Sequence, residues 1–416
     1  MKSKKLFFLS IFLFAFFPIL PNRAKGLPVI IFFLCALFIF FKHPRIKKFN
    51  FKKVVFFSGV YIFYLFSLFY TENFKSIDKT LSTRLSLIII PISFGLLSTV
   101  IYKIDEHIFK KLSQIYFIAT ILYCLAVVYT IINLQYYIDK VTINDVYNRL
   151  TNNMFGIEQH PIYASILISI AIFLSAFKLM KTNNIYKKGL LLFGNIILLY
   201  TLFFFSRKAV ILAVFLALLV FVFTYFKKIK IKKILIISTL VFTAAILTTP
   251  VVKKRFKEVF YSVTYSKISP DNSSSIRFGI YKCVLETIKQ HPIIGYGIGD
   301  VDIALQQCYT KTSKFLVDGN YNSHNQYLGI MLSSGVFGLL FFVLFLLYNV
   351  RKAIQHQNKF FLVLLIFYIV VMFFENILER QSGVIIFAFY ICFFNFIKIE
   401  KINPIALEKE DHNHRS

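Results

Sequence analysis

Long apolar runs determine the fold class of this chain before any single residue is considered. A bilayer is crossed by a helix of about 20 mainly apolar residues, and runs near this length recur along the whole sequence. They fall at residues 6–20, 27–41, 54–70, 85–102, 114–134, 161–179, 189–205, 209–226, 234–249, 326–349, 360–377 and 384–397. The sequence therefore predicts an all-α polytopic membrane protein with about 12 transmembrane helices.

Two details refine these spans. Only Ser206, Arg207 and Lys208 interrupt the apolar stretch 189–226, which as one helix would be about 57 Å long at 1.5 Å per residue. We therefore expect two spans joined by a tight turn. The first run follows a basic start, as a signal peptide would, but no small-x-small cleavage pattern comes after it, so we expect an uncleaved first helix.

Basic residues are unusually numerous: 48 Lys+Arg against 19 Asp+Glu give a formal charge of +29. Such an excess fits nucleic-acid binding, but the chain is 57% hydrophobic and its cations fall in short blocks between apolar runs. With the N-terminus inside, the inward segments hold 28 of the cations, the short outward loops 10, and the long segment 250–323 the other 10. The bias predicts an N-in and C-in protein with 250–323 outside the cytoplasmic membrane.

The spans divide the chain into four parts. These are residues 1–249 with nine spans, 250–325 as a large outer loop, 326–397 with three spans and 398–416 as a tail. Cys283 and Cys308 share the outer loop and can pair if the compartment is oxidising, although the sequence does not bring them within bridging distance. No CxxC pair or His/Cys cluster indicates a metal site.

Three ionisable residues stand against apolar surface on the predicted outer face, where function in a membrane protein is best sought. Arg207 lies in the turn between two spans, and Arg277 lies on the apolar side of the amphipathic stretch 273–290, in its expected first turn. His324 lies at the start of the span 326–349, where a neutral imidazole can act as a general base. The plainer alternatives are an interfacial cation, an Arg paired with a carboxylate, and an ordinary polar loop residue.

Further polar residues extend this face. Glu158 and His160 lie at the outward start of the sixth span, and Glu375 and Glu379 lie at the outward end of the eleventh. Each is as readily structural as functional. We include His160, Glu379 and two neighbours of His324, Tyr321 and Asn325, in a candidate pocket. The stretch Gly295-Tyr296-Gly297-Ile298-Gly299-Asp300 resembles a phosphate loop, but no strand–helix unit surrounds it, so its glycines are expected to shape a turn.

The order of these motifs resembles the O-antigen ligase/O-antigen polymerase family. The resemblance rests on a Ser-Arg turn, an outer loop with an Arg-led helix and His-Pro-Ile-Ile-Gly-Tyr-Gly-Ile-Gly-Asp, and Asn-Ser-His-Asn-Gln-Tyr-Leu followed by Ser-Gly-Val-Phe-Gly-Leu-Leu. By motif it covers about 195–345. The chain has no Trp, whereas aromatic positions of relatives are often Trp.

The resemblance implies a GT-C-like glycosyltransferase of the bacterial inner membrane with a periplasmic active face. Such an enzyme transfers a glycan from undecaprenyl pyrophosphate to an acceptor hydroxyl, without a metal ion or cofactor. In lipopolysaccharide biosynthesis the acceptor is the lipid A-core. By position, Arg207 and Arg277 match the pyrophosphate-contacting arginines and His324 the histidine that activates the acceptor. The alternatives are a polysaccharide polymerase with a second lipid-linked glycan as acceptor, a protein O-oligosaccharyltransferase, and, less favoured, a lipid-linked sugar flippase. No nucleic-acid partner is expected.

Overall fold

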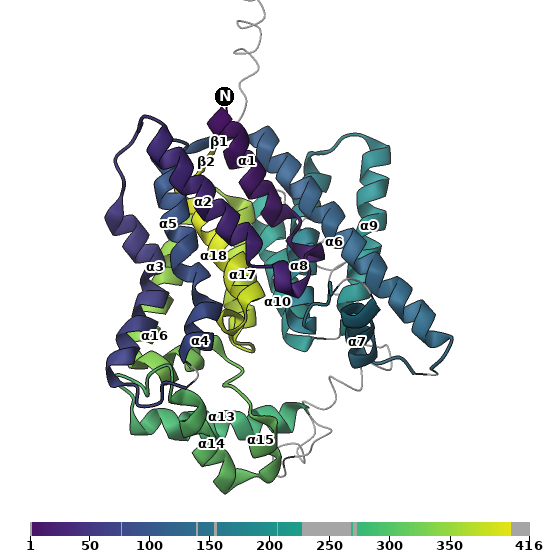
Figure 1. Ribbon diagram of the computed structural model, residues 1–416. Coiled ribbons are helices and arrows are strands. Elements are labelled where there is room, and N and C mark those ends of the chain that lie inside the picture. The colour runs from purple at the N-terminus through teal and green to yellow at the C-terminus, as the bar shows by residue number, and fades with distance from the viewer. Residues whose placement is uncertain are drawn as a thin grey trace, which may run out of the picture.

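The structure, a computed structural model, describes residues 2–75, 77–138, 140–153, 156–205, 207–226, 268 and 273–400. Its main body is a bundle of helices that run roughly along one common direction (Figure 1). The bundle helices are α1 (Lys2–Ala15), α2 (Leu27–Lys42), α3 (Phe51–Phe66), α4 (Ile77–Arg84), α5 (Ser86–Ser98), α6 (Glu106–Gln135), α8 (Pro161–Lys181), α9 (Ile185–Phe205), α10 (Lys208–Tyr225), α16 (Gln326–Gln355), α17 (Lys359–Met372) and α18 (Gln381–Phe396).

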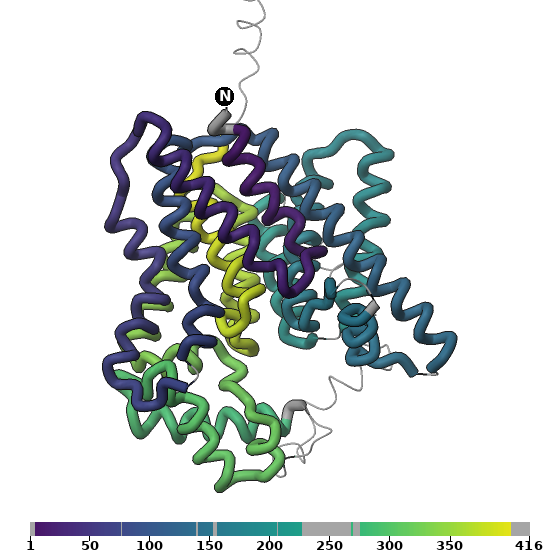
Figure 2. Tube along the Cα trace, viewed as in Figure 1, coloured from purple at the N-terminus to yellow at the C-terminus, as the bar shows by residue number. Residues whose placement is uncertain are grey.

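Shorter elements lie at the two ends of the bundle. At the end near the N-terminus, the strands β1 (Lys103–Asp105) and β2 (Lys398–Glu400) pair in parallel. At the opposite end lie α7 (Ile143–Asn153), α13 (Ser273–Gln290), α14 (Val301–Thr312) and α15 (Lys314–Gly319) (Figure 1). The trace in Figure 2 brings residues 398–400 back to the end where the chain starts. Both ends of the described chain therefore lie on the same side of the bundle.

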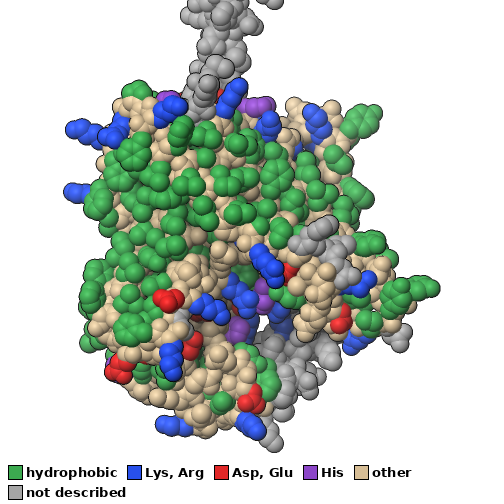
Figure 3. Space-filling view, in the orientation of Figure 1, with side chains coloured by type: hydrophobic (Ala, Val, Ile, Leu, Met, Phe, Trp, Pro, Cys, Tyr) green, Lys and Arg blue, Asp and Glu red, His purple; other side chains and the backbone are tan. Residues whose placement is uncertain are grey.

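The bundle confirms an all-α polytopic membrane protein. Within the described residues, eight helices are long and apolar enough to cross a membrane, and Lys5–Ala15, Lys359–Met372 and Gln381–Phe396 are shorter apolar helices. Eleven of the twelve predicted spans coincide with helices, and the twelfth, 234–249, lies outside the described residues. In Figure 3, hydrophobic side chains cover the middle of the bundle, and Lys and Arg side chains line the edge near the N-terminus.

The first and tenth predicted spans differ from the observed helices for local reasons. The first span was expected to run to residue 20, but α1 ends at Ala15 and a 3₁₀ turn, Phe17–Ile19, follows. Pro18 causes this change, because proline lacks the N–H that would continue the helix and restricts the residue before it. Likewise, the span 326–349 was expected to be one helix, but Gly335 interrupts α16 with φ of 61° and ψ of −164°.

Phenylalanine side chains fill much of the space between the bundle helices. Phe14 stacks on Phe389 with ring centroids 4.3 Å apart, and Phe94 lies 4.8 Å from Phe32. These contacts join α1, α2, α5 and α18, which are far apart in the sequence. Lipid tails are as apolar as these rings, so close packing rather than exclusion from water holds such helices together.

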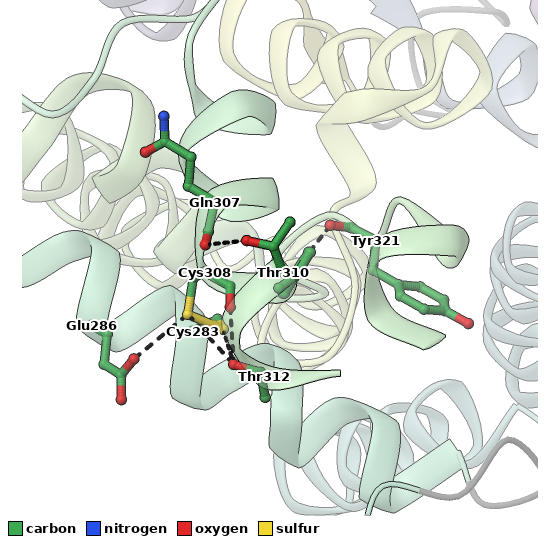
Figure 4. The surroundings of a disulfide bond; sticks show 8 residues. Cys283, Glu286, Gln307, Cys308, Thr310, Thr312 and Tyr321 are labelled. Atoms are coloured by element: carbon green, nitrogen blue, oxygen red, sulfur yellow. Dashed lines mark hydrogen bonds between the residues drawn. A yellow bond between two sulfur atoms is a disulfide. The ribbon is translucent and has the colours of Figure 1, made fainter. Parts of the chain in front are cut away.

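Helices α13–α15 form a small unit with its own core at the end of the bundle opposite β1 and β2. Ile280, Val284 and Ile288 are buried, whereas Lys282, Glu286 and Lys289 are exposed, which confirms the predicted amphipathic helix. A disulfide between Cys283 and Cys308 joins α13 to α14, with Glu286 and Thr312 beside it (Figure 4). The question that the sequence left open is thus answered in favour of pairing.

The glycine-rich stretch 295–299 docks this unit on the bundle. The backbone N–H groups of Tyr296 and Gly297 donate to Leu332 O and Ser333 O, at 2.7 and 3.0 Å, and Val336 N donates to Pro292 O at 2.9 Å. The chain approaches α16 so closely that a Cβ at Gly295 or Gly335 would overlap backbone atoms of the other segment. The glycines therefore shape a close turn, as predicted, and they also account for the break in α16.

Candidate functional site

A buried carboxylate joins two of the three residues that the sequence singled out. Glu375, in the turn between α17 and α18, lies 2.5 Å from Arg277 Nη2 through Oε1 and 3.5 Å from His324 Nδ1 through Oε2. Its side chain is only 7% exposed. Residues from α13, from the start of α16 and from the α17–α18 turn thus meet at one point.

The charge of Glu375 is maintained by its neighbours. Burial alone would raise its pKa, but the adjacent imidazole of His324 and the positive charges of Arg277 and Arg207 outweigh burial and lower the pKa below its ordinary value. The carboxylate is therefore ionised at neutral pH. An ionised carboxylate beside one ring nitrogen of a histidine orients the ring and leaves the other nitrogen available to a substrate.

Local turns fix the position of His324. Its backbone lies in the left-handed region, with φ of 44°, which is uncommon outside glycine. Asn322 Oδ1 accepts a hydrogen bond from His324 N at 3.0 Å, and Asn325 Oδ1 caps α16 by accepting from Tyr327 N and Leu328 N. Polar turn residues on both sides therefore offset the backbone strain and hold the imidazole at the end of the helix, where it was expected.

Arg277 differs from expectation in two respects. It is the fifth residue of α13 and so lies one residue beyond the first turn, where the effect of the helix dipole is weaker. Its partner carboxylate is Glu375 of the membrane bundle, 98 residues away in the chain. The alternative of an arginine paired with a carboxylate is thus realised, but with a residue of the candidate site itself. A guanidinium has five N–H donors, so this pairing leaves donors for a second anion.

The turn around Arg207 belongs to the same cluster. Arg207 directly precedes α10, which confirms the predicted helix–turn–helix, although Ser206 lies outside the described residues. Its positive charge lowers the pKa of both Glu375 and His160. Burial, then the charges of Arg380 and Arg207, lower the pKa of His160 to about 4, so this imidazole is neutral at pH 7.

Polar atoms near the start of α8 are left without partners in the described part of the chain. Glu158 and Gln159 are buried, yet Glu158 Oε2, Gln159 Nε2 and His160 Nδ1 have no hydrogen-bond partner there. Lys25, also buried, holds Gln159 Oε1 at 2.6 Å from the other side. Buried polar atoms are nearly always paired, so these groups point to a polar ligand. The sequence did not single out Gln159 or Lys25, whose burial depends on contacts between distant segments.

The other pocket candidates lie around the same histidine. The ring of Tyr321 is 6.0 Å from that of His324, and Glu379 accepts hydrogen bonds from the side-chain amides of Asn322 and Asn376. Asn325 uses its side-chain oxygen to cap α16. Across the described ranges, no group of three or more His, Cys, Asp or Glu side chains is placed to hold a metal ion.

The cluster lies where the small unit of helices α13–α15 meets the bundle. Figure 3 shows Lys, Arg and His side chains gathered around a hollow between the membrane helices and α13–α15. Glu375 was expected to add an ionisable group to the outer face. No local pattern in the sequence indicated that it would pair with Arg277. Its one signal was an acidic residue near the end of an apolar span, in a chain with few acidic residues.

Part of this chain is similar to known proteins. Residues 193–343 match the family described as O-Antigen ligase. The ComP-specific O-oligosaccharyltransferase of Acinetobacter baylyi is 30% identical over 175 residues, which cover 42% of this chain and 30% of that protein. The chain thus aligns with less than a third of that relative's length. Arg207, Arg277 and His324 all lie inside the family match, and Glu375 lies outside it. Residues 193–343 therefore resemble the O-antigen ligase family.

Proposed function

We propose that this protein transfers a glycan from undecaprenyl pyrophosphate to an acceptor hydroxyl at the periplasmic face of the bacterial inner membrane. The observation that carries the proposal is the bridge that Glu375 makes between Arg277 and His324. It brings together a candidate base and a candidate anion-binding cation at the outer end of a membrane bundle. The family match supports glycan transfer in general.

In this mechanism His324 acts as the general base. The imidazole nitrogen that faces away from Glu375 takes the proton of the acceptor hydroxyl, and the oxygen forms a bond to the anomeric carbon. The bond from that carbon to the phosphate oxygen breaks, and the electron pair leaves with the diphosphate. Attack from the side opposite the leaving group inverts the anomeric configuration. The buried carboxylate stabilises the imidazolium that forms.

Arg207 and Arg277 would bind the diphosphate and neutralise the charge that develops as it leaves. Fixed cations in a site shielded from water stabilise such charge strongly, because they need no reorganisation during the reaction. Arginine also suits phosphate geometry, since its planar donors can make two parallel hydrogen bonds. No step in this scheme needs a metal ion.

The location of the site supports a lipid-linked donor. The cluster lies at the end of a bundle whose surface is widely apolar, so a polyprenyl chain can remain between helices or in the bilayer while its head group reaches the site (Figure 3). The disulfide between Cys283 and Cys308 suits an oxidising compartment outside the cytoplasmic membrane. Because α13 carries both Arg277 and Cys283, the same compartment would contain the reaction.

For the acceptor we propose a glycolipid of the lipid A-core type, in line with the description of the family. A protein hydroxyl is a second candidate, supported by the relative named as an O-oligosaccharyltransferase. A polymerase would use a second lipid-linked glycan with the same donor chemistry. A flippase is less favoured, because transport sites lie near the bilayer midplane, whereas this cluster lies at one end of the bundle.

Deletion of the gene tests the proposal and separates its versions. Accumulation of lipid-linked polymer without attachment to a glycolipid indicates a ligase, accumulation of single repeat units indicates a polymerase, and loss of glycoproteins indicates protein transfer. Complementation with His324→Ala or Arg277→Ala should restore nothing, although each variant is inserted and expressed at the normal level. Restored transfer by either variant in a purified assay would remove that residue from the mechanism.

A further inference from the structure

A cavity of about 270 Å³ lies beside the candidate site. It opens between α4, the start of α14, the first turns of α16 and the turn that follows α17. Its lining includes Tyr64, Thr83, Arg84, Gln326, Ser333 and Glu379. Pockets for drug-sized ligands measure roughly 300–1,000 Å³, so this cavity has room for a small group of about one sugar ring.

Arg84 is held in the wall of this cavity with a donor left over. Its Nε donates to Leu378 O at 3.1 Å, and its guanidinium carbon lies 4.9 Å from the centre of the Tyr64 ring. Nη1 is buried and has no hydrogen-bond partner among the described residues. A buried charged donor without a partner is costly, so a fixed guanidinium with this geometry indicates an acceptor that comes from a ligand.

The balance of charge in the lining distinguishes between ligand classes. Two cations, Lys79 and Arg84, and two carboxylates, Asp302 and Glu379, line the cavity, so their formal charges cancel. A phosphate here would lie beside two carboxylates, which repel it. Sugar hydroxyl groups both donate and accept hydrogen bonds and therefore match a lining that has both kinds of group.

The cavity shares its frame with His324. Gln326 lies two residues after the histidine, and its Oε1 accepts a hydrogen bond from Leu378 N at 2.7 Å. The carbonyl oxygen of the same Leu378 accepts the hydrogen bond from Arg84 Nε. Glu379 accepts from Asn322, the same side chain that holds the backbone of His324. A group bound in the cavity is thus fixed relative to the histidine by two short connections.

We infer that this cavity is a sugar subsite and that Arg84 is a positioning residue in it, binding a hydroxyl group of the glycan on one side of the bond that forms. This inference rests on the proposed function. The sugar comes either from the donor glycan or from the acceptor glycan, and both offer the same chemistry. Arg84 contacts the substrate away from the reacting atoms, so its loss should act on sugar affinity.

Binding of free sugars tests the subsite without requiring transfer. The full chain in nanodiscs is titrated with two probes: oligosaccharide released by mild acid from the lipid-linked donor fraction, and the deacylated acceptor glycolipid. Arg84→Gln should weaken the binding of one probe by about tenfold or more, since a hydrogen bond to a charged group is lost. The probe that responds identifies the source of the sugar. Arg149→Gln, an exposed arginine of α7, is the matched control and should bind as the wild type does.

Three results would overturn the subsite. The first is that wild type and Arg84→Gln bind both probes with equal affinity. The second is that Arg84→Gln binds inorganic pyrophosphate more weakly than the wild type does but binds both sugar probes normally. The third is that Arg149→Gln loses as much sugar affinity as Arg84→Gln. If Arg84→Gln is unstable, Arg84→Lys serves, because it keeps the charge without the planar donors and should recover only part of the affinity.

The two proposals fail separately. If the wild type transfers no glycan but binds sugar in a way that depends on Arg84, the subsite stands and the proposed reaction is wrong. With transfer that depends on His324 but sugar binding indifferent to Arg84, the reaction stands and the subsite falls. Under transfer conditions, a raised KM for one substrate with kcat nearly unchanged is the pattern expected of Arg84→Gln.

Discussion

Glu375→Gln is the substitution that tests the candidate site most directly. The amide has nearly the same shape as the carboxylate but carries no charge, so the change removes the counterion shared by Arg277 and His324. We expect transfer to slow sharply although both of these residues are still present. The family match does not reach residue 375, so this prediction comes from the geometry alone.

The magnitude follows from the contact between Glu375 Oε2 and His324 Nδ1, at 3.5 Å. Two unit charges at this distance attract by roughly 5 kcal/mol at an effective dielectric constant of 20, before the cost of desolvation is counted. Hydrogen bonds to charged groups contribute about 1.5–3 kcal/mol to stability in practice. We use the smaller range for the expected loss of free energy, because the carboxylate is already desolvated in the resting protein. A loss of this size in the transition state lowers kcat about 10- to 150-fold.

The assay is steady-state transfer by purified protein, with donor and acceptor each varied up to saturation. Glu286→Gln, on the exposed face of α13, is the matched control and should keep the wild-type rate. The KM for the donor should not rise in Glu375→Gln, because Arg277 gains donors for the diphosphate when its partner carboxylate is removed. A kcat within about threefold of wild type, well short of the expected loss, would refute the assignment of Glu375 as the partner of the base.

The same variant has a signature in its stability. The pKa of Glu375 is lowered in the folded protein, so the ionised carboxylate stabilises the fold above the ordinary value of 4.5. This contribution is lost as the pH falls from that value through the lowered pKa. Between pH 7 and pH 3 the wild type should therefore lose more thermal stability than Glu375→Gln. Parallel losses in the two proteins would contradict the ion pair.

Three further substitutions probe the other parts of the site. Arg207→Lys should transfer poorly, because lysine cannot contact phosphate through two parallel hydrogen bonds; near-normal transfer would mean that charge alone matters there. His324→Gly should keep the thermal stability of the wild type, since glycine accepts a φ of 44°, but lose transfer. Gly335→Ala should destabilise the protein by about 1–3 kcal/mol from backbone strain alone, because φ is 61° and the new Cβ would overlap Ile293 O. Gly189→Ala, with no atom within 4 Å of its Cβ, is the control and should show no loss in a thermal melt.

The sequence was sufficient wherever a local pattern decides the structure. Apolar length placed the spans, and helical periodicity placed Ile280, Val284 and Ile288 on the buried side of α13. The order of the spans also predicted that Arg207, Arg277 and His324 lie on one face, because the loops between spans alternate between the two sides of a membrane. These features depend on residues close to one another in the chain.

The parts that the sequence did not predict depend on distant contacts. Gly335 fits a transmembrane helix as well as a break, and the break arises from the approach of residues 292–297. The pairing of Arg277 with Glu375 spans 98 residues, and five separate segments line the cavity near Arg84. Neither hydropathy nor helical period carries information about such pairs, so the ionisable residues could be placed on a face but not given partners.

The two neighbouring sites differ in charge in the way that a lipid-diphosphate sugar differs along its length. Around Glu375, the positive charges of Arg277 and Arg207 act on one carboxylate, so the described cluster carries more positive than negative charge. Beside it, two cations and two carboxylates balance in the cavity near Arg84. A diphosphate is stabilised by the arginines around Glu375 and repelled by the carboxylates of the cavity near Arg84. Neutral hydroxyl groups form hydrogen bonds in the cavity and do not compete with the diphosphate for the arginines. If the sugar in the cavity belongs to the donor, we therefore predict one binding orientation, with the diphosphate at the arginines and the sugar directed toward the region between His324 and Arg84.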